Sequence, residues 1–176
     1  MRLFLGLPLP LDFAEALART ARATGIANAR WIPAENIHLT LVFLGSVAEE
    51  RLPAIVHELD HIDPPPLRLR VTNFGTFPRA GVFFAEVEPA PVLLQLQTQL
   101  VAAMTRCGFP QDDRPYHPHI TLARVRGTVR LSSRQVAIPL SAARSFDVNC
   151  VNLYQSRTLS EGARYEVLAQ RPARTC

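Results

Sequence analysis

One four-residue pattern occurs twice in the chain, as His38-Leu39-Thr40-Leu41 and as His119-Ile120-Thr121-Leu122. Each copy lies in an apolar run of the kind that forms a buried strand. Residues two apart in a strand project from the same face, so each copy presents an imidazole and a hydroxyl to one side. Two such strands side by side would bring two histidines and two threonines to one site, which indicates acid–base chemistry on a phosphate group.

Two imidazoles at one site can divide the work of hydrolysing a phosphodiester. Histidine exchanges protons readily near neutral pH, because its reference pKa is about 6.5. One histidine can take a proton from water while the other protonates the leaving oxygen, with no metal required. The threonine hydroxyls can donate hydrogen bonds to the nonbridging oxygens, where charge builds up in the transition state. The candidate catalytic residues are therefore His38, His119, Thr40 and Thr121.

An arginine close to the second copy, Arg124, is a candidate substrate-binding residue, since a guanidinium group suits phosphate contact. Strict alternation puts Arg124 on the opposite face of the strand from His119 and Thr121, unless the strand bulges or twists there. Phe4 and Tyr116 could stack on a base, although core or strand packing explains these rings as well.

The remaining histidines have other interpretations. His117 also flanks the second copy, but its position corresponds to Asn36 in the first copy, so we assign it to the pocket edge or to a structural role. His57 and His61 are four residues apart on a predicted helix, a spacing that could hold zinc. No third ligand accompanies them in the sequence, so a solvated helix face is the better interpretation.

Composition excludes several kinds of chemistry. The net charge is +4 and the pI about 9.5, which suits a polyanionic partner. All nineteen basic residues are arginine, so a Schiff-base lysine, a P-loop lysine and a lysine-adenylate intermediate are ruled out. The three cysteines have no metal-binding or disulfide spacing. We expect no metal and no cofactor, and we expect the protein in the reducing cytoplasm.

The apolar start of the chain does not indicate a membrane protein. Pro8 and Pro10 interrupt it, and no cleavage site follows, so we interpret it as a buried strand rather than a signal peptide. No apolar run approaches the length of a membrane span. The positive net charge suits a polyanionic partner, and we expect a monomer without an obligate protein partner or a membrane contact.

Hydrophobic periodicity predicts strands alternating with helices. The apolar faces of the helices are predicted at Phe13, Leu17 and Ala21, at Leu52, Ile55, Val56 and Leu59, and at Val92, Leu96, Leu100 and Met104. The predicted strands are 3–7, 37–44, 67–76, 81–87, 118–125, 146–156 and 165–170, and the predicted helices are 11–24, 48–61 and 91–107. Residues 127–141 form a connection with little pattern.

The two halves of the chain resemble each other. The order strand, helix, motif strand occurs in residues 3–44 and again in residues 81–125, and the two motif histidines are 119 − 38 = 81 residues apart. This spacing predicts an internal duplication with a pseudo-two-fold axis that brings the motifs face to face. We therefore expect residues 1–176 to form a single domain of two similar lobes.

Several blocks together resemble a known group of enzymes. The chain is similar to the 2H phosphoesterase superfamily, and within it to the bacterial and archaeal RNA 2',3'-cyclic phosphodiesterases, historically called 2'-5' RNA ligases. The likeness covers nearly the whole chain. The blocks that carry it are Arg2-Leu3-Phe4, Trp31-Ile32-Pro33, Asn36 to Gly45, Arg114 to Arg124, Ser156-Arg157 and Gly162 to Tyr165.

The resemblance implies an α+β fold that is bilobed and duplicated, with two lobes of antiparallel-rich sheet, outer helices and a central cleft lined by the motifs. It implies metal-independent hydrolysis of a 2',3'-cyclic phosphate to a 2'-phosphomonoester, with RNA ends or nucleotides as the partners. By position, His38 would protonate the leaving 3'-oxygen, His119 would activate water, and Thr40 and Thr121 would hold the phosphate. Tyr116 departs mildly from the family pattern, which often has Phe at this position.

Two alternatives from other classes remain. A non-catalytic RNA-binding module could use the same cleft, but the chain lacks interleaved arginines and aromatics, and such a module would show salt-sensitive binding without turnover. A metal-dependent hydrolase lacks carboxylates at a fixed spacing from the motifs, although spatial neighbours could supply them.

Overall fold

The computed structural model describes residues 1–110, 114–126, 138, 144–159 and 162–173. Its strands are β1 (Arg2–Pro8), β2 (Ala29–Trp31), β3 (His38–Ser46), β4 (Leu67–Phe77), β5 (Val82–Val87), β6 (His119–Val125), β7 (Ser145–Val148), β8 (Cys150–Leu159) and β9 (Gly162–Pro172). Its α-helices are α1 (Leu11–Arg22), α2 (Leu52–Asp60) and α3 (Pro91–Arg106). Short 3₁₀ turns precede β3, α2 and β5, at Ala34–Asn36, Glu49–Arg51 and Pro78–Ala80.

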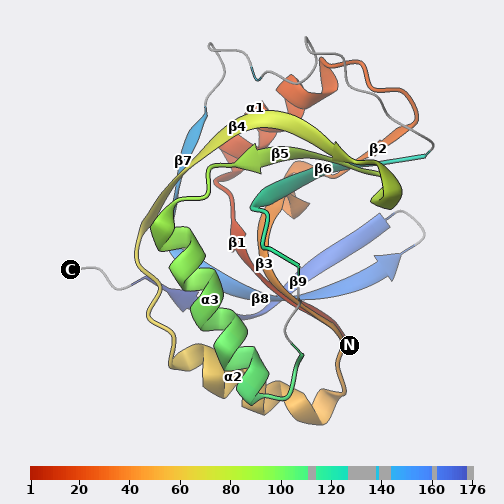
Figure 1. Ribbon diagram of the computed structural model, residues 1–176. Coiled ribbons are helices and arrows are strands. Elements are labelled where there is room, and N and C mark those ends of the chain that lie inside the picture. The colour runs from red at the N-terminus through yellow and green to blue at the C-terminus, as the bar shows by residue number, and fades with distance from the viewer. Residues whose placement is uncertain (111–113, 127–137, 139–143, 160–161, 174–176) are drawn as a thin grey trace.

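The strands form one nine-stranded antiparallel sheet in an α+β fold. The order across the sheet is β7-β4-β5-β6-β3-β1-β8-β9, and β2 pairs with β6 outside this path. The sheet is strongly curved, with β4, β5 and β6 on one side and β1, β3, β8 and β9 on the other (Figure 1). The two motif strands, β3 and β6, are neighbours at its centre.

The helices form where the apolar residues recur at helical spacing, and they bury that face. In α1 the predicted residues Phe13, Leu17 and Ala21 are buried, and Phe13 packs on Phe146 of β7 with ring centroids 4.7 Å apart. In α3 the predicted residues are buried except Val92, which is 38% exposed. Its neighbour Leu93 is buried instead, so the inward face of this helix begins one residue later than we predicted.

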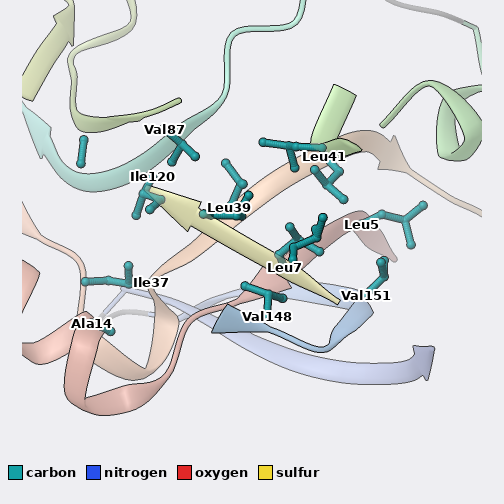
Figure 2. Close-up of a cluster of buried hydrophobic side chains, with 14 of the residues drawn as sticks. Leu5, Leu7, Ala14, Ile37, Leu39, Leu41, Val87, Ile120, Val148 and Val151 are labelled. Carbon is teal, nitrogen blue, oxygen red and sulfur yellow. The ribbon is translucent and has the colours of Figure 1, made fainter. Parts of the chain in front are cut away.

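A continuous core lies behind the motif strands. Leu39 and Ile120, the residues between histidine and threonine in each motif, are both 0% exposed. Figure 2 shows them close together among side chains from β1, β5 and β8. The aliphatic residues predicted to be core at these positions are therefore confirmed, and their burial fixes which face of β3 and β6 the polar residues occupy. The labelled core side chains include Leu5, Leu7, Ile37, Leu41, Val87 and Val151.

Two parts of the predicted organisation were wrong. The predicted strand 146–156 is broken at Asn149: β7 pairs with β4, whereas β8 pairs with β1 on the other side of the sheet. The short strand β2 was not predicted, because its three residues are too few to show alternation. The predicted connection 127–141 lies, apart from Ile138, outside the described residues. Among the described helices, none is long and apolar enough to span a membrane.

Candidate functional site

The two motifs meet where β3 and β6 pair. Leu39 lies opposite Ile120 in an antiparallel register, so each motif histidine lies across from the threonine of the other motif. All four polar side chains are partly exposed, in contrast to the buried residues between them. We call this side of β3 and β6 the motif face. The resulting cross-strand pairs are His38 with Thr121 and Thr40 with His119.

Hydrogen bonds fix the ring of His38. Its Nδ1 is 2.7 Å from the backbone carbonyl of Asn36, and since a carbonyl only accepts, Nδ1 carries the proton. Its Nε2 is 3.1 Å from Oγ1 of Thr40 and accepts from that hydroxyl when the ring is neutral. Phe4 stacks on the imidazole with centroids 4.7 Å apart, and Tyr165 meets it edge-on at 5.0 Å. The ring is therefore held with Nε2 as its basic atom, in contact with the Thr40 hydroxyl.

The ring of His119 is held in the same way. Its Nδ1 is 2.7 Å from the carbonyl of His117, so this nitrogen also carries the proton. Two aromatic rings contact the imidazole nearly edge-on, Phe77 with centroids 5.0 Å apart and Phe84 at 5.3 Å. In both motifs the histidine donates to the carbonyl two residues before it, which leaves Nε2 available for proton transfer.

Burial disfavours the charged form of both imidazoles. It lowers the pKa of His38 to about 4, with the hydrogen bond to Asn36 acting in the opposite direction and the proximity of His119 adding to the decrease. Burial likewise lowers the pKa of His119; the hydrogen bond to His117 opposes this, and the charges of His117 and Arg124 add to it. His119 thus contributes to the lowered pKa of His38, and both rings are neutral at pH 7 in the free protein.

A β-bulge decides the position of Arg124. Phe84 pairs with Thr121, but the preceding residue, Phe83, pairs with Ala123, so Leu122 is skipped in the register. Arg124 pairs with Val82, which shares a face of β5 with Phe84. The extra residue therefore returns Arg124 to the motif face, as expected from the sequence if the strand bulged. The charge of Arg124 helps to lower the pKa of His119.

The same irregularity occurs in the first motif and reveals a residue that the sequence reasoning missed. Leu5 pairs with Val42 and Gly6 with Thr40, so Leu41 is skipped as Leu122 is. Phe43 then pairs with Phe4, stacks beside it with centroids 6.2 Å apart, and is 58% exposed. The signal was present in the sequence, because 43 + 81 = 124 makes Phe43 the counterpart of Arg124.

Other aromatic residues line the motif face. The guanidinium of Arg2 lies 5.4 Å from the centre of the Phe43 ring. Burial raises the pKa of Tyr165, while Arg124 and Arg2 act to lower it, so this ring lies within the field of both cations. A cavity of about 280 Å³ opens next to His38. Its lining includes Leu9, Leu11, Asn36, His38, Tyr154 and Tyr165.

The remaining candidates have structural positions. Phe4 is 2% exposed, which favours the packing interpretation over base stacking. The hydroxyl of Tyr116 donates to the carbonyl of Thr40 at 2.8 Å and ties the approach to β6 onto β3. His117 is half exposed at the edge of the site, with Nε2 3.8 Å from Oε1 of Glu86.

His57 and His61 lie apart from the motifs on and just after α2, where their rings meet edge-on at 4.5 Å. In the part of the chain that the structure describes, no group of three or more His, Cys, Asp or Glu side chains could hold a metal ion.

Known proteins are similar to this chain over most of its length. The family model described as the 2'-5' RNA ligase superfamily matches residues 10–158. The chain belongs to this superfamily. An RNA 2',3'-cyclic phosphodiesterase of Escherichia coli K12 is 33% identical over 171 residues, covering 95% of this chain and 93% of the relative. One from Methanocaldococcus jannaschii is 27% identical and covers 97% and 99%. The resemblance drawn from the sequence blocks is therefore confirmed.

Solved structures show the same fold. The E. coli LigT structure complexed with 3'-AMP matches with a TM-score of 0.81 and 28% identity, covering 99% of this chain and 98% of that one. A crystal structure described as a phosphoesterase matches with a TM-score of 0.85 and 30% identity, covering 99% of both chains. This superfamily member thus shares the LigT-like fold over nearly its whole length.

Proposed function

We propose that this protein hydrolyses a terminal 2',3'-cyclic phosphate on RNA ends or nucleotides to a 2'-phosphomonoester, without a metal. The pairing of Leu39 with Ile120 carries the proposal, because it sets both motif histidines on one face. Each ring uses Nδ1 for a backbone carbonyl and keeps Nε2 as its basic atom. The relatives named RNA 2',3'-cyclic phosphodiesterase support the substrate class. The LigT structures complexed with 3'-AMP and with phosphate support a nucleotide ligand in this fold.

In this mechanism His119 acts as the general base. Its Nε2 takes a proton from a water molecule as the water oxygen attacks phosphorus. The bond from phosphorus to the 3'-oxygen breaks, and His38 gives that oxygen its proton from Nε2, so the phosphate remains on the 2'-oxygen. Thr40 and Thr121 donate hydrogen bonds to the nonbridging oxygens, and Arg124 offsets their growing negative charge.

Binding of the phosphate explains how His38 comes to carry the proton that it donates. His38 is neutral in the free protein, because burial lowers its pKa to about 4. A phosphate anion beside the ring favours the charged form and raises that pKa, so the ring takes up a proton as substrate binds. Once charged, the ring can give its Nε2 proton to the leaving 3'-oxygen as that oxygen gains negative charge.

The two halves of the sheet support an internal duplication. Outward from the centre, β3 is followed by β1, β8 and β9, and β6 is followed by β5, β4 and β7. Both halves contain the order strand, helix, motif strand, and the skipped residues, Leu41 and Leu122, are again 81 positions apart. We infer one domain over 1–176 with two similar lobes and a central cleft at the motif face, acting as a cytoplasmic monomer.

Phe43 and Arg124 would make the two ends of this cleft different. They occupy corresponding positions, yet one is an exposed ring and the other an exposed cation. An exposed aromatic face suits stacking on a nucleobase, and a guanidinium suits the phosphate. The terminal nucleoside would then extend toward Phe43, with its cyclic phosphate between the two histidines.

The decisive experiment is turnover of 2',3'-cyclic AMP in EDTA, with the position of the product phosphate read by chromatography. We expect 2'-AMP, and we expect His38→Ala and His119→Ala each to lower kcat/KM by about 10²- to 10⁴-fold. His57→Ala, a substitution on α2 away from the motifs, should leave turnover at the wild-type level. Full activity in either motif variant, or dependence on added metal, would contradict the two-histidine mechanism.

A further inference from the structure

A second arginine stands next to Arg124. In the register of β2 and β6, Arg30 pairs directly with Arg124, and both side chains are exposed. Figure 1 shows β2 running alongside β6 at the edge of the central strands. Directly opposed residues of an antiparallel pair have Cα atoms about 5 Å apart and project from the same side. Two long cationic side chains therefore emerge together next to the motifs.

The packing of β2 shows which side this is. Trp31 lies against Phe83, a fully buried residue of β5, with ring centroids 5.9 Å apart. Residues alternate along a strand, so Arg30 projects to the side opposite Trp31. That side is the motif face, since Arg124 was returned to it by the bulge at Leu122.

Neither arginine is neutralised within the described part of the chain. Among the described residues, no Asp or Glu forms an ion pair with Arg30 or Arg124. Arg70 on β4, by contrast, pairs with Glu88 at 2.8 Å. Like charges directly opposite each other in a sheet are destabilising. An anionic ligand that binds both guanidinium groups would offset this repulsion between Arg30 and Arg124.

We propose that Arg30 binds a second phosphate, the phosphodiester or monoester on the 5' side of the nucleotide whose cyclic phosphate lies at Arg124. The inference rests on the proposed function and names the substrate class more closely. Arg124 contacts the reacting phosphate, and its cross-strand neighbour reaches the next phosphate along the same strand. The protein then prefers RNA ends, or nucleotides with a 5'-phosphate, over cyclic nucleosides with a free 5'-hydroxyl.

The test compares three substrates: 2',3'-cyclic AMP, the same nucleotide with a 5'-phosphate, and a dinucleotide ending in a 2',3'-cyclic phosphate. In the wild type we expect kcat/KM to be about 10-fold higher for the two substrates with a 5'-side phosphate, and Arg30→Gln to remove that preference. A preference for the dinucleotide alone would place the contact on the second nucleoside and overturn the assignment to phosphate.

Two further variants separate this contact from general charge effects. Arg30→Lys retains a cation and should retain most of the preference. Arg68→Gln removes the same charge on β4, which β5 separates from β6, and should leave the preference intact. The salt dependence gives a second readout, since losing one phosphate contact reduces the slope of log KM against log salt by about 0.7 for a single strand.

The outcomes distinguish the two proposals. Turnover of cyclic AMP without any preference for a 5'-side phosphate, or a preference that survives Arg30→Gln, overturns the second phosphate site and leaves the proposed function standing. Absence of turnover on all three substrates overturns the proposed function itself.

Discussion

At the scale of single residues, the two motif histidines share one hydrogen-bonding arrangement. Each donates from Nδ1 to the carbonyl two residues before it, at 2.7 Å in both motifs. That bond selects the tautomer and turns Nε2 toward the motif face. The spacing within each motif was sufficient to predict that its histidine and threonine share a face, because alternation in a strand is a local property. The catalytic roles of His38, Thr40, His119 and Thr121 stay a prediction.

The buried imidazole of His38 links stability to pH. The folded protein holds this ring neutral to about pH 4, whereas the unfolded chain takes up a proton below about pH 6.5. Its contribution to the free energy of unfolding is therefore complete above pH 6.5 and is lost as the pH falls toward 4. From the size of the pKa difference, the loss is about 3 kcal/mol.

Urea denaturation measures this loss of unfolding free energy. The wild type and His38→Gln are compared at several pH values between 7 and 4. The variant lacks the titrating ring, so its stability should fall less steeply with acid than that of the wild type. Equal slopes for the two proteins would show that His38 is not held neutral by the fold.

At the scale of secondary structure, the bulges determine which side chains lie beside the motif histidines and threonines. The sequence predicted the strands that carry the motifs but not the skipped residues Leu41 and Leu122. A bulge depends on the register with a partner strand, and a single strand's pattern does not contain that information. For the same reason the exposed ring of Phe43 was missed, and Arg124 remained a candidate on the wrong face of an ideal strand.

The bulge at Leu122 predicts a direct role for Arg124 in turnover. Because the side chain lies on the motif face, Arg124→Gln removes a charge next to the developing oxyanion and should lower kcat/KM for cyclic AMP by about 100-fold. Arg126→Gln, with the same charge change at an exposed position just after β6, is the matched control. Equal, small effects of the two substitutions would mean that only net charge matters.

Gly75 of β4 supports the site through a cross-strand contact. It pairs with Phe84, and a Cβ at this position would lie 2.6 Å from Cζ of that ring. Phe84 in turn contacts His119. Gly75→Ala should therefore push the ring toward the imidazole, lowering both kcat and stability, the latter by about 1–3 kcal/mol.

A double-substitution cycle tests whether this contact is the cause. Replacing Phe84→Leu in the Gly75→Ala background removes the ring atoms that collide, so part of the lost stability should return. Thermal unfolding of the four proteins measures the coupling. Strict additivity would place the effect of Gly75→Ala elsewhere in β4.

At the scale of the whole molecule, the strand order follows contacts that are distant in sequence. β1 pairs with β8, with Arg2 opposite Ser156, whereas the adjacent strands β4 and β5 form a hairpin. The sequence predicted most elements but wrongly joined β7 and β8 into one strand, 146–156, because no local pattern shows that they belong to opposite sides of the sheet. The repeat of 81 residues predicted the placement of the motif strands but not their outer neighbours.

This connectivity predicts an order of folding. Contacts between segments close in sequence form early, and long-range strand pairing is slow. We expect backbone amides of β4 and β5 to gain protection from hydrogen exchange before those that join β1 to β8. Pulse labelling during refolding, read by mass spectrometry of peptides, measures both. Simultaneous protection would indicate that the sheet assembles in one step.

The placement of Trp31 has a practical consequence. It is the one tryptophan in the sequence, and it lies on the short strand that carries Arg30 and pairs with β6, with the guanidinium of Arg22 5.9 Å from its ring centre. The protein thus contains a single intrinsic fluorophore one residue from the proposed second phosphate contact. Its emission spectrum offers a label-free signal for titrating oligonucleotides onto the wild-type enzyme and onto variants that no longer turn over.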